Sequence, residues 1–238
     1  MNLVKRLANL GYGSRREVRH LIRSGAVTDT AGRVLGEKEI VAHEEIRVLG
    51  EALDPAAPLT LLLHKPAGYT CSADDPGAIV HELLPPRFAR RQPGLHPVGR
   101  LDKDTTGLLL LTDDGQLLHR IIHPKSRCRK VYHATLDRPL AGHEAALFAS
   151  GDLVLKSETR PLLPATLEIL GEKEALLTLH EGRYHQVRRM FAAAGNHVVA
   201  LRRVALGDLA LPDELAEGDW RELAPEELDA IFAMRDIE

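Results

Sequence analysis

Four consecutive leucines at residues 108–111 constrain the fold of this 238-residue chain more than any other segment. A short, wholly apolar run bounded by polar turns is typical of a strand buried on both faces of a sheet. The polar segment just before it contains Arg100 and Asp102. Residues i and i+2 of an extended backbone point to the same face, so we expect these side chains to emerge together from a buried strand. The spacing fits two interpretations equally: a carboxylate presented for chemistry, and a polar turn shaped by Asp102 and Asp104.

The composition favours a globular protein of two domains. The chain is 44% hydrophobic and has room for a small domain and a medium one. No apolar run approaches the roughly 18 residues that cross a bilayer, and the N-terminus lacks an apolar secretory segment. We therefore expect a cytoplasmic protein without a membrane partner.

Signals for metals, disulfides and cofactors are missing from the sequence. The two cysteines, Cys71 and Cys128, form no CxxC pair, and the twelve histidines are scattered. There is no Walker loop, no GxGxxG and no HExxH motif. We expect two reduced thiols, no metal site and no cofactor.

The charges are segregated along the chain, although the formal net charge is only −3. Six basic residues and one acidic residue lie between Lys5 and Arg23, and residues 120–130 and 183–203 each carry five basic residues and no acidic one. Eleven acidic residues lie in 208–238. Because a polyanion responds to the potential within about 8–10 Å, the basic patches favour RNA phosphates as ligands. Each patch alone also fits an ordinary solvated face.

A basic helix is predicted near the N-terminus. Ser14 and Glu17 have the spacing of a capping box, and apolar residues then recur at helical spacing until Gly25. Four arginines share an arc of about 100° beside the apolar stripe. These are Arg15, Arg16, Arg19 and Arg23. We expect this helix to bind RNA phosphates.

The same patterns predict the domain limits. The basic helix and short strands at residues 26–28, 33–35 and 45–49 make up a small first domain, residues 1–52. Residues 53–59, LDPAAPL, contain two prolines and no periodicity, which is typical of a linker. The larger domain then covers residues 60–238.

Helices and strands of the larger domain are mixed without regular βαβ alternation. Helices are predicted at residues 117–122, 141–149 and 185–194, and strands at residues 60–64, 108–111, 130–136, 165–170, 175–180 and 198–204. This order favours an α+β fold with a mixed, largely antiparallel sheet flanked by helices.

Two segments together resemble a known family. GRLDKDTTGLLLLTDDG, at residues 99–115, resembles the catalytic motif of RNA pseudouridine synthases, and EGRYHQVRRM, at residues 181–190, resembles their later motif. The resemblance is to the branch that modifies ribosomal RNA and carries an S4-like RNA-binding domain ahead of the catalytic domain. It covers nearly the whole chain. It implies the pseudouridine synthase fold and the isomerisation of uridine to pseudouridine.

Three catalytic residues are implied by this resemblance. Asp102 supplies the carboxylate that acts on a flipped-out uridine, Arg188 forms its salt bridge, and Tyr132 packs on the target base. Helical periodicity also lets Arg188 reach inward beside the stripe of Val187 and Met190, although an exposed phosphate clamp fits as well. From the residues alone, Tyr132 equally fits an ordinary sheet-surface tyrosine.

Further residues are expected to contact RNA. The family has an arginine at the position of Arg100 that fills the space left by the displaced nucleotide. Arg183 and His185 are expected to shape or line the same cleft. A structural hydrogen bond is the more ordinary role for His185.

The segment YHQVRRMFAAAGNHV resembles the small-subunit enzymes more than the large-subunit ones, which tend to carry an asparagine and a basic residue where Tyr184 and His185 stand. We therefore expect a monomeric 16S rRNA pseudouridine synthase whose partner is 16S rRNA or an immature small-subunit particle. One alternative is a 23S rRNA pseudouridine synthase of the same family. The other is a noncatalytic S4-type RNA-binding factor of ribosome assembly, against which the intact GRLD and HQVRR segments argue.

Overall fold

The computed structural model describes residues 2–123, 126 and 128–232. The chain divides into two compact units. The first contains the N-terminal residues up to Thr60 together with His81–His96 and Thr112–Asp114. The second contains Leu61–Val80, Pro97–Leu111 and the chain from Gly115 onward. The predicted first domain, residues 1–52, does not include residues 81–96, which this division places in the first unit. The predicted domain limits stay a prediction.

Residues 53–59, the predicted linker, are tied down within the first unit. The buried Asp54 carboxylate forms a two-point ion pair with Arg87. Leu59 is buried, and its N–H donates to the Asp113 carboxylate over 2.7 Å. The lack of periodicity in this segment reflects an irregular but anchored path, because its partners are about 30 and 50 residues further along the chain.

The N-terminal part of the first unit pairs two helices with a small sheet. The elements are α1 (Leu3–Asn9), α2 (Arg15–Arg23), β1 (Val27–Asp29), β2 (Ile46–Val48) and β3 (Glu51–Ala52). The predicted capping box is confirmed, because the Ser14 hydroxyl accepts from the Glu17 N–H and the Glu17 carboxylate accepts from the Ser14 N–H. The strand predicted at residues 33–35 is reduced to a single bridge between Thr28 and Val34.

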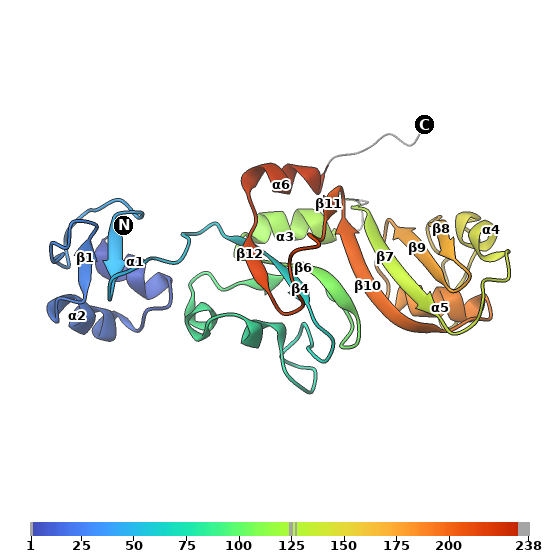
Figure 1. Ribbon diagram of the computed structural model, residues 1–238, viewed down its shortest axis with the longest axis horizontal. Coiled ribbons are helices and arrows are strands. Elements are labelled where there is room, and N and C mark those ends of the chain that lie inside the picture. Colours follow the sequence, from blue (N-terminus) through green and yellow to red (C-terminus); the bar gives the residue numbers. More distant parts are fainter. Residues whose placement is uncertain (1, 124–125, 127, 233–238) are drawn as a thin grey trace. The chain divides into compact units, whose positions relative to one another are not determined.

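A nine-stranded sheet of the described residues organises the second unit, with its strands in the order β12-β4-β6-β10-β7-β9-β8 (Figure 1). In addition, β11 pairs with β10 and β5 pairs with β6. The strands are β4 (Thr60–Lys65), β5 (His96–Pro97), β6 (Thr106–Thr112), β7 (Lys130–Leu136), β8 (Thr166–Gly171), β9 (Glu174–Leu179), β10 (Val198–Leu206), β11 (Leu209–Ala210) and β12 (Trp220–Glu222). β6 and β10 run parallel, whereas β10 with β7, β7 with β9, β8 with β9 and β4 with β12 run antiparallel. The predicted α+β fold with a mixed, largely antiparallel sheet is confirmed.

The remaining helices are short. They are the 3₁₀ helices η1 (Val80–Leu83) and η2 (Pro86–Arg90), and the α-helices α3 (Gly115–Ile122), α4 (Glu144–Ala149), α5 (Gln186–Ala193) and α6 (Pro225–Ala230). α4 lies beside β8, and α5 beside β10 (Figure 1). The helix predicted from residue 141 begins only at Glu144, because the Glu144 carboxylate accepts from the N–H groups of Ala141 and Gly142. None of the helices in the described ranges is long and apolar enough to cross a membrane.

The leucine run is buried as predicted, since Leu108, Leu109, Leu110 and Leu111 have no exposed surface. Gly107 stands directly before it, in β6, opposite Arg203 of β10. Its φ is +105°, and a Cβ there would lie 2.2 Å from the Arg203 carbonyl oxygen. Only glycine fits this close approach of two strands. Both cysteines, Cys71 and Cys128, are free and buried.

Candidate active site

A cavity of about 1000 Å³ lies in the second unit. Three segments contribute much of its wall: the chain just before β6, the start of β7, and the chain between β9 and α5. The chain after β4, the end of α3 and β10 complete it. Asp102, Tyr132 and His185 are among the lining residues, one from each of the first three segments. The volume is at the upper end of the range for ligand-binding pockets, which is about 300–1,000 Å³.

Asp102 is presented by a turn. The Thr105 N–H donates to the Asp102 carbonyl over 3.0 Å, and β6 begins only at Thr106. The prediction that Arg100 and Asp102 extend from the strand itself is therefore wrong, although both line the cavity. The Asp102 side chain is 29% exposed, so its carboxylate is partly sheltered and still open to a ligand.

Lys65, at the end of β4, forms hydrogen bonds to the backbone of this turn. Its ammonium group donates to the carbonyls of Thr105 (2.8 Å), Pro66 (3.0 Å) and Lys103 (3.2 Å). Lys65 is fully buried, and burial lowers its pKa. Two of these acceptors, the carbonyls of Lys103 and Thr105, belong to the turn that follows Asp102. Lys65 therefore fixes the backbone that carries the carboxylate.

Arg188 of α5 lies between two carboxylates. Its Nη2 is 2.8 Å from Asp104 Oδ2, and its Nε is 4.0 Å from Asp102 Oδ2. Its Nη1 donates to the Val198 carbonyl over 2.9 Å. The side chain is only 19% exposed. The ion pair expected between Arg188 and Asp102 is present as a long contact, and the closer partner is Asp104, which is 68% exposed.

His185 approaches the other oxygen of the same carboxylate, with its Nε2 3.4 Å from Asp102 Oδ1. It caps the start of α5 in the left-handed region, with φ of +47°. The Tyr184 ring stacks on the His185 ring, with centroids 3.8 Å apart and planes 18° apart. Asp102 thus has a cation on one side and an imidazole on the other.

Arg183 lines the cavity, and the RNA contact predicted for it stays a prediction. Its guanidinium pairs with Glu158 and Glu181 and donates to the carbonyls of Arg160 and Pro161. Its donors are thus used within the protein. The partners lie on loops, and the local sequence pattern does not reveal them. The residue lines the cavity and braces its wall.

Glu158 also binds Arg189, whose Nη1 lies 2.6 Å from Glu158 Oε1. The hydrogen bonds and charges of Arg183 and Arg189 lower the pKa of Glu158. The Arg189 guanidinium further donates to the carbonyls of Tyr184 (3.1 Å) and Lys156 (2.6 Å). This cluster, Glu158 with Arg183 and Arg189, therefore clamps both ends of the segment that carries His185.

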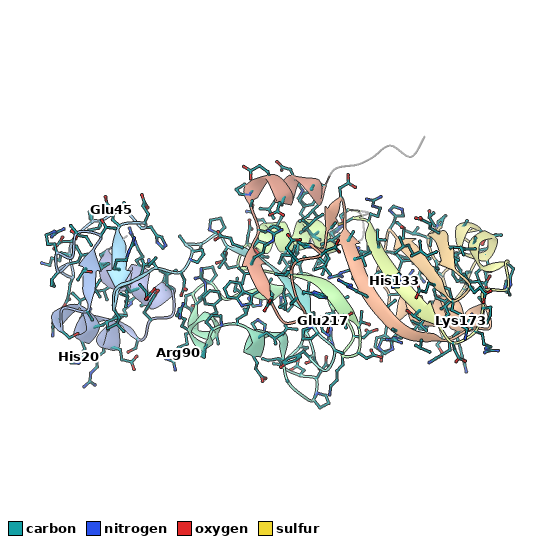
Figure 2. All side chains as sticks on the ribbon, viewed as in Figure 1. His20, Glu45, Arg90, His133, Lys173 and Glu217 are labelled. Atoms are coloured by element: carbon teal, nitrogen blue, oxygen red, sulfur yellow. The ribbon has the colours of Figure 1, made fainter. Side chains whose placement is uncertain are left out.

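β7 brings Tyr132 and Lys130 to the cavity. Residues two apart on a strand share a face, whereas the next residue, His133, alternates to the other face (His133 is labelled in Figure 2). Its Nε2 lies 3.7 Å from Glu174 Oε2. Tyr132 is half-buried and lies opposite Arg203 of β10 in the strand register. Arg203 is buried, lines the cavity, and its Nε donates to the Leu108 carbonyl over 2.7 Å.

Arg100 lines the cavity and pairs with Asp75 at its rim. The four arginines of α2 belong to the first unit and are all exposed. Arg19 and Arg23 share the Glu37 carboxylate. Within the part of the chain that the structure describes, Arg15 and Arg16 form no ion pair.

Sequence reasoning missed Lys65, Lys130, Arg203 and Tyr184 as residues of this site or of its support. Lys65 and Arg203 carry a readable signal, because each is a cation within or beside an apolar strand, where a charge needs a partner. Tyr184 has none, since no local pattern predicts that its ring stacks on the neighbouring His185. No group of three His, Cys, Asp or Glu side chains that could hold a metal ion occurs among the described residues.

One cavity thus holds a partly sheltered carboxylate, Asp102, an imidazole, His185, and a half-buried tyrosine, Tyr132. The guanidinium of Arg188 adjoins the carboxylate. Such a carboxylate can act as a nucleophile or can stabilise a cationic sugar. The cavity around it is large enough for a whole nucleoside.

Comparison with known proteins identifies the family. Residues 60–193 match the family described as RNA pseudouridylate synthase. The chain is 43% identical to the ribosomal small subunit pseudouridine synthase A of Pasteurella multocida over 232 residues, 96% of this chain and 98% of the relative. It is 44% identical to the protein of the same name from Escherichia coli K12 over 210 residues, 84% of this chain and 89% of the relative.

A solved crystal structure of a pseudouridylate synthase superimposes with a TM-score of 0.70, at 39% identity, over 97% of this chain and 99% of that one. The match in sequence and the match in fold both extend over the catalytic cavity. The chain belongs to the RNA pseudouridylate synthase family.

Proposed function

We propose that this enzyme isomerises one or more uridines of the small-subunit ribosomal RNA, 16S rRNA, to pseudouridine. The observation that carries the proposal is the Asp102 carboxylate in a cavity of nucleoside size, between His185 and Arg188. The names of the most similar relatives, ribosomal small subunit pseudouridine synthase A, support the small subunit as the source of the RNA.

The reaction is an internal rearrangement in which atoms and electrons balance. The bond from N1 of the base to C1′ of the sugar breaks, and a bond from C5 to C1′ forms. C5 loses its proton and N1 gains one, so no group is imported and nothing is oxidised. Asp102 serves this exchange either by attacking the sugar or base or by stabilising the cationic sugar.

The neighbouring residues position Asp102. Arg188 places a positive charge near Oδ2, and His185 approaches Oδ1. Tyr132 packs on the extracted base from β7, and this stacking offsets part of the few kcal/mol that extraction from the helix costs. Arg100, at the cavity wall, contacts the RNA around the displaced nucleotide.

The first unit contributes affinity in this proposal. Residues 1–52 act as an S4-like RNA-binding domain, and the exposed Arg15 and Arg16 of α2 bind phosphates. In this proposal the enzyme acts as a monomer in the cytoplasm, on 16S rRNA or an immature small-subunit particle.

The test is a pseudouridine map. Purified protein is incubated without cofactor with 16S rRNA, 23S rRNA and immature small-subunit particles, and each RNA is then mapped by carbodiimide modification and primer extension. We expect new pseudouridine in 16S rRNA, free or within the particle, and none in 23S rRNA. Product confined to 23S rRNA would contradict the proposed substrate. Tight RNA binding without product would contradict the proposed activity.

A further inference from the structure

Tyr184 is largely exposed, at 76% of its surface. Among the Phe, Trp and Tyr side chains of residues 2–123, 126 and 128–232, it is the only one in this class. The other aromatic side chains in these ranges are buried or half-buried. Tyr184 also lines the catalytic cavity. Most of this ring is open to water beside the proposed nucleotide site, which leaves surface for a ligand to cover.

One face of this ring is already occupied. The Tyr184 and His185 rings stack at 3.8 Å with an angle of 18°, and His185 in turn lies 3.4 Å from Asp102. Since the side chain is so exposed, the other face of the Tyr184 ring is open to solvent. A flat ligand placed there would be separated from the Asp102 carboxylate by the two rings.

The backbone under the two rings is held in place. Arg189 donates to the Tyr184 carbonyl over 3.1 Å and is itself bound to Glu158. On the other side, the Arg183 N–H donates to the Gln186 side chain over 2.8 Å. A surface whose supports are fixed before binding loses little conformational entropy when a ligand stacks on it.

We propose that the stacked pair Tyr184–His185 is a second nucleobase-binding site, which takes the base of a nucleotide adjacent to the target uridine. This inference rests on the proposed function, because the RNA it binds is the substrate. Stacking on an aromatic ring suits any of the four bases, since each has a π-face. The site therefore positions the RNA next to Asp102 rather than reading its sequence.

Three variants separate stacking from bulk and from folding. Tyr184→Ala removes the ring, Tyr184→Leu keeps apolar bulk, and Tyr184→Phe keeps the ring. Ile169→Ala is the matched control, because Ile169 is an exposed apolar residue of β8 outside the cavity wall. The three Tyr184 variants and the Ile169→Ala control should all have the thermal unfolding midpoint of the wild type, since the altered side chains are exposed.

The readout is kcat/KM on a 16S rRNA fragment that contains the mapped uridine. We expect Tyr184→Ala to lose about 5- to 150-fold, the equivalent of one base stacked on an aromatic ring, mainly through a higher KM. Tyr184→Phe should retain the wild-type value and Tyr184→Leu should resemble Tyr184→Ala. An unchanged Tyr184→Ala, or full rescue by leucine, would overturn the inference.

A second measurement locates the bound base. Each nucleotide beside the target is replaced in turn by an abasic nucleotide. The wild-type enzyme should lose activity at one position, and Tyr184→Ala should show no further loss at that position. If every abasic substitution reduced the activity of Tyr184→Ala by the same factor as that of the wild type, no base would be stacked on Tyr184, and the inference would be contradicted. If the wild-type enzyme modifies no uridine in 16S rRNA, the proposed function itself fails, whereas product made equally well by Tyr184→Ala refutes the second site alone.

Discussion

Replacing Arg188 with methionine tests how the cavity holds its carboxylates. The change keeps the aliphatic length and removes three interactions: a 2.9 Å hydrogen bond to the Val198 carbonyl, the 2.8 Å pair with Asp104, and the 4.0 Å contact with Asp102. A buried pair that loses one partner costs about 3–5 kcal/mol. The value here is smaller, because Asp104 is largely exposed and an exposed ion pair contributes about 0–1 kcal/mol.

The main contribution is the bond from Arg188 to the carbonyl of the buried Val198, since a hydrogen bond to a charged group is worth about 1.5–3 kcal/mol. Together the interactions predict a destabilisation of about 1.5–4 kcal/mol for Arg188→Met. For a chain of this length, that lowers the thermal midpoint by about 3–16 °C. Arg188→Lys should lose less, because an ammonium group keeps the charge and gives up the forked geometry.

Activity should fall further than stability requires. Removing one group that stabilises charge at an active site typically costs about 10²–10³ in rate, and we expect this loss in single-turnover pseudouridine formation at a temperature where Arg188→Met is folded. Arg221→Met is the matched control, because its guanidinium pairs with Glu227 outside the cavity wall. If Arg188→Met matched the wild-type rate, or if Arg221→Met lost as much, the assignment of Arg188 to the site would be refuted.

Three further predictions follow from other parts of the molecule. Lys65→Met should slow product formation at unchanged RNA affinity, because the turn after Asp102 loses its donor; a wild-type rate in single-turnover assays would contradict this. Glu158 has its pKa held below the ordinary value of 4.5, so its stabilisation is present above that pH and is lost as the pH falls through the folded-state pKa. The gap in thermal midpoint between wild type and Glu158→Gln should therefore shrink on acidification below pH 4.5, and a constant gap would refute the pairing. Arg15→Glu with Arg16→Glu should reduce the slope of log affinity against log salt by about 1.4–1.8, and an unchanged slope would show that α2 makes no phosphate contacts.

Local signals predicted those elements whose sequence pattern agrees with their tertiary setting. Residues 108–111 are apolar because β6 is buried on both faces, and the pair Ser14 and Glu17 caps a helix whose apolar stripe packs inward. In both segments, propensity, hydrophobic pattern and burial favour the same structure. Such segments are readable without knowledge of the rest of the chain.

The backbone around Asp102 was not readable in this way. β6 begins four residues after Asp102, and the intervening turn is held by Lys65, a residue of a different strand. In the same way, Arg183 has the charge expected of an RNA contact, but its partner Glu158 lies 25 residues earlier. Long-range partners decide both settings, and neither the period nor the composition of the local sequence encodes them.

The composition of the site was more predictable than its geometry. Asp102, Tyr132 and His185 line one cavity, and Arg188 adjoins Asp102, as the resemblance to the family implies. The closer contact of Arg188 with Asp104 depends on how the turn presents two carboxylates two residues apart. Tyr184 stacks on His185, which has a left-handed φ. Residues other than glycine adopt this backbone in only a few per cent of cases, although histidine is enriched among them, so the local sequence does not predict it here.

The central claim is that the Asp102 carboxylate carries out the chemistry on uridine. The most direct measurement is single-turnover pseudouridine formation by Asp102→Asn on the 16S rRNA substrate, with RNA affinity measured on the same preparation. The amide keeps the size of the side chain and removes its charge and nucleophilicity, so we predict retained RNA binding and no product. Pseudouridine formed at the wild-type rate by Asp102→Asn would contradict the account.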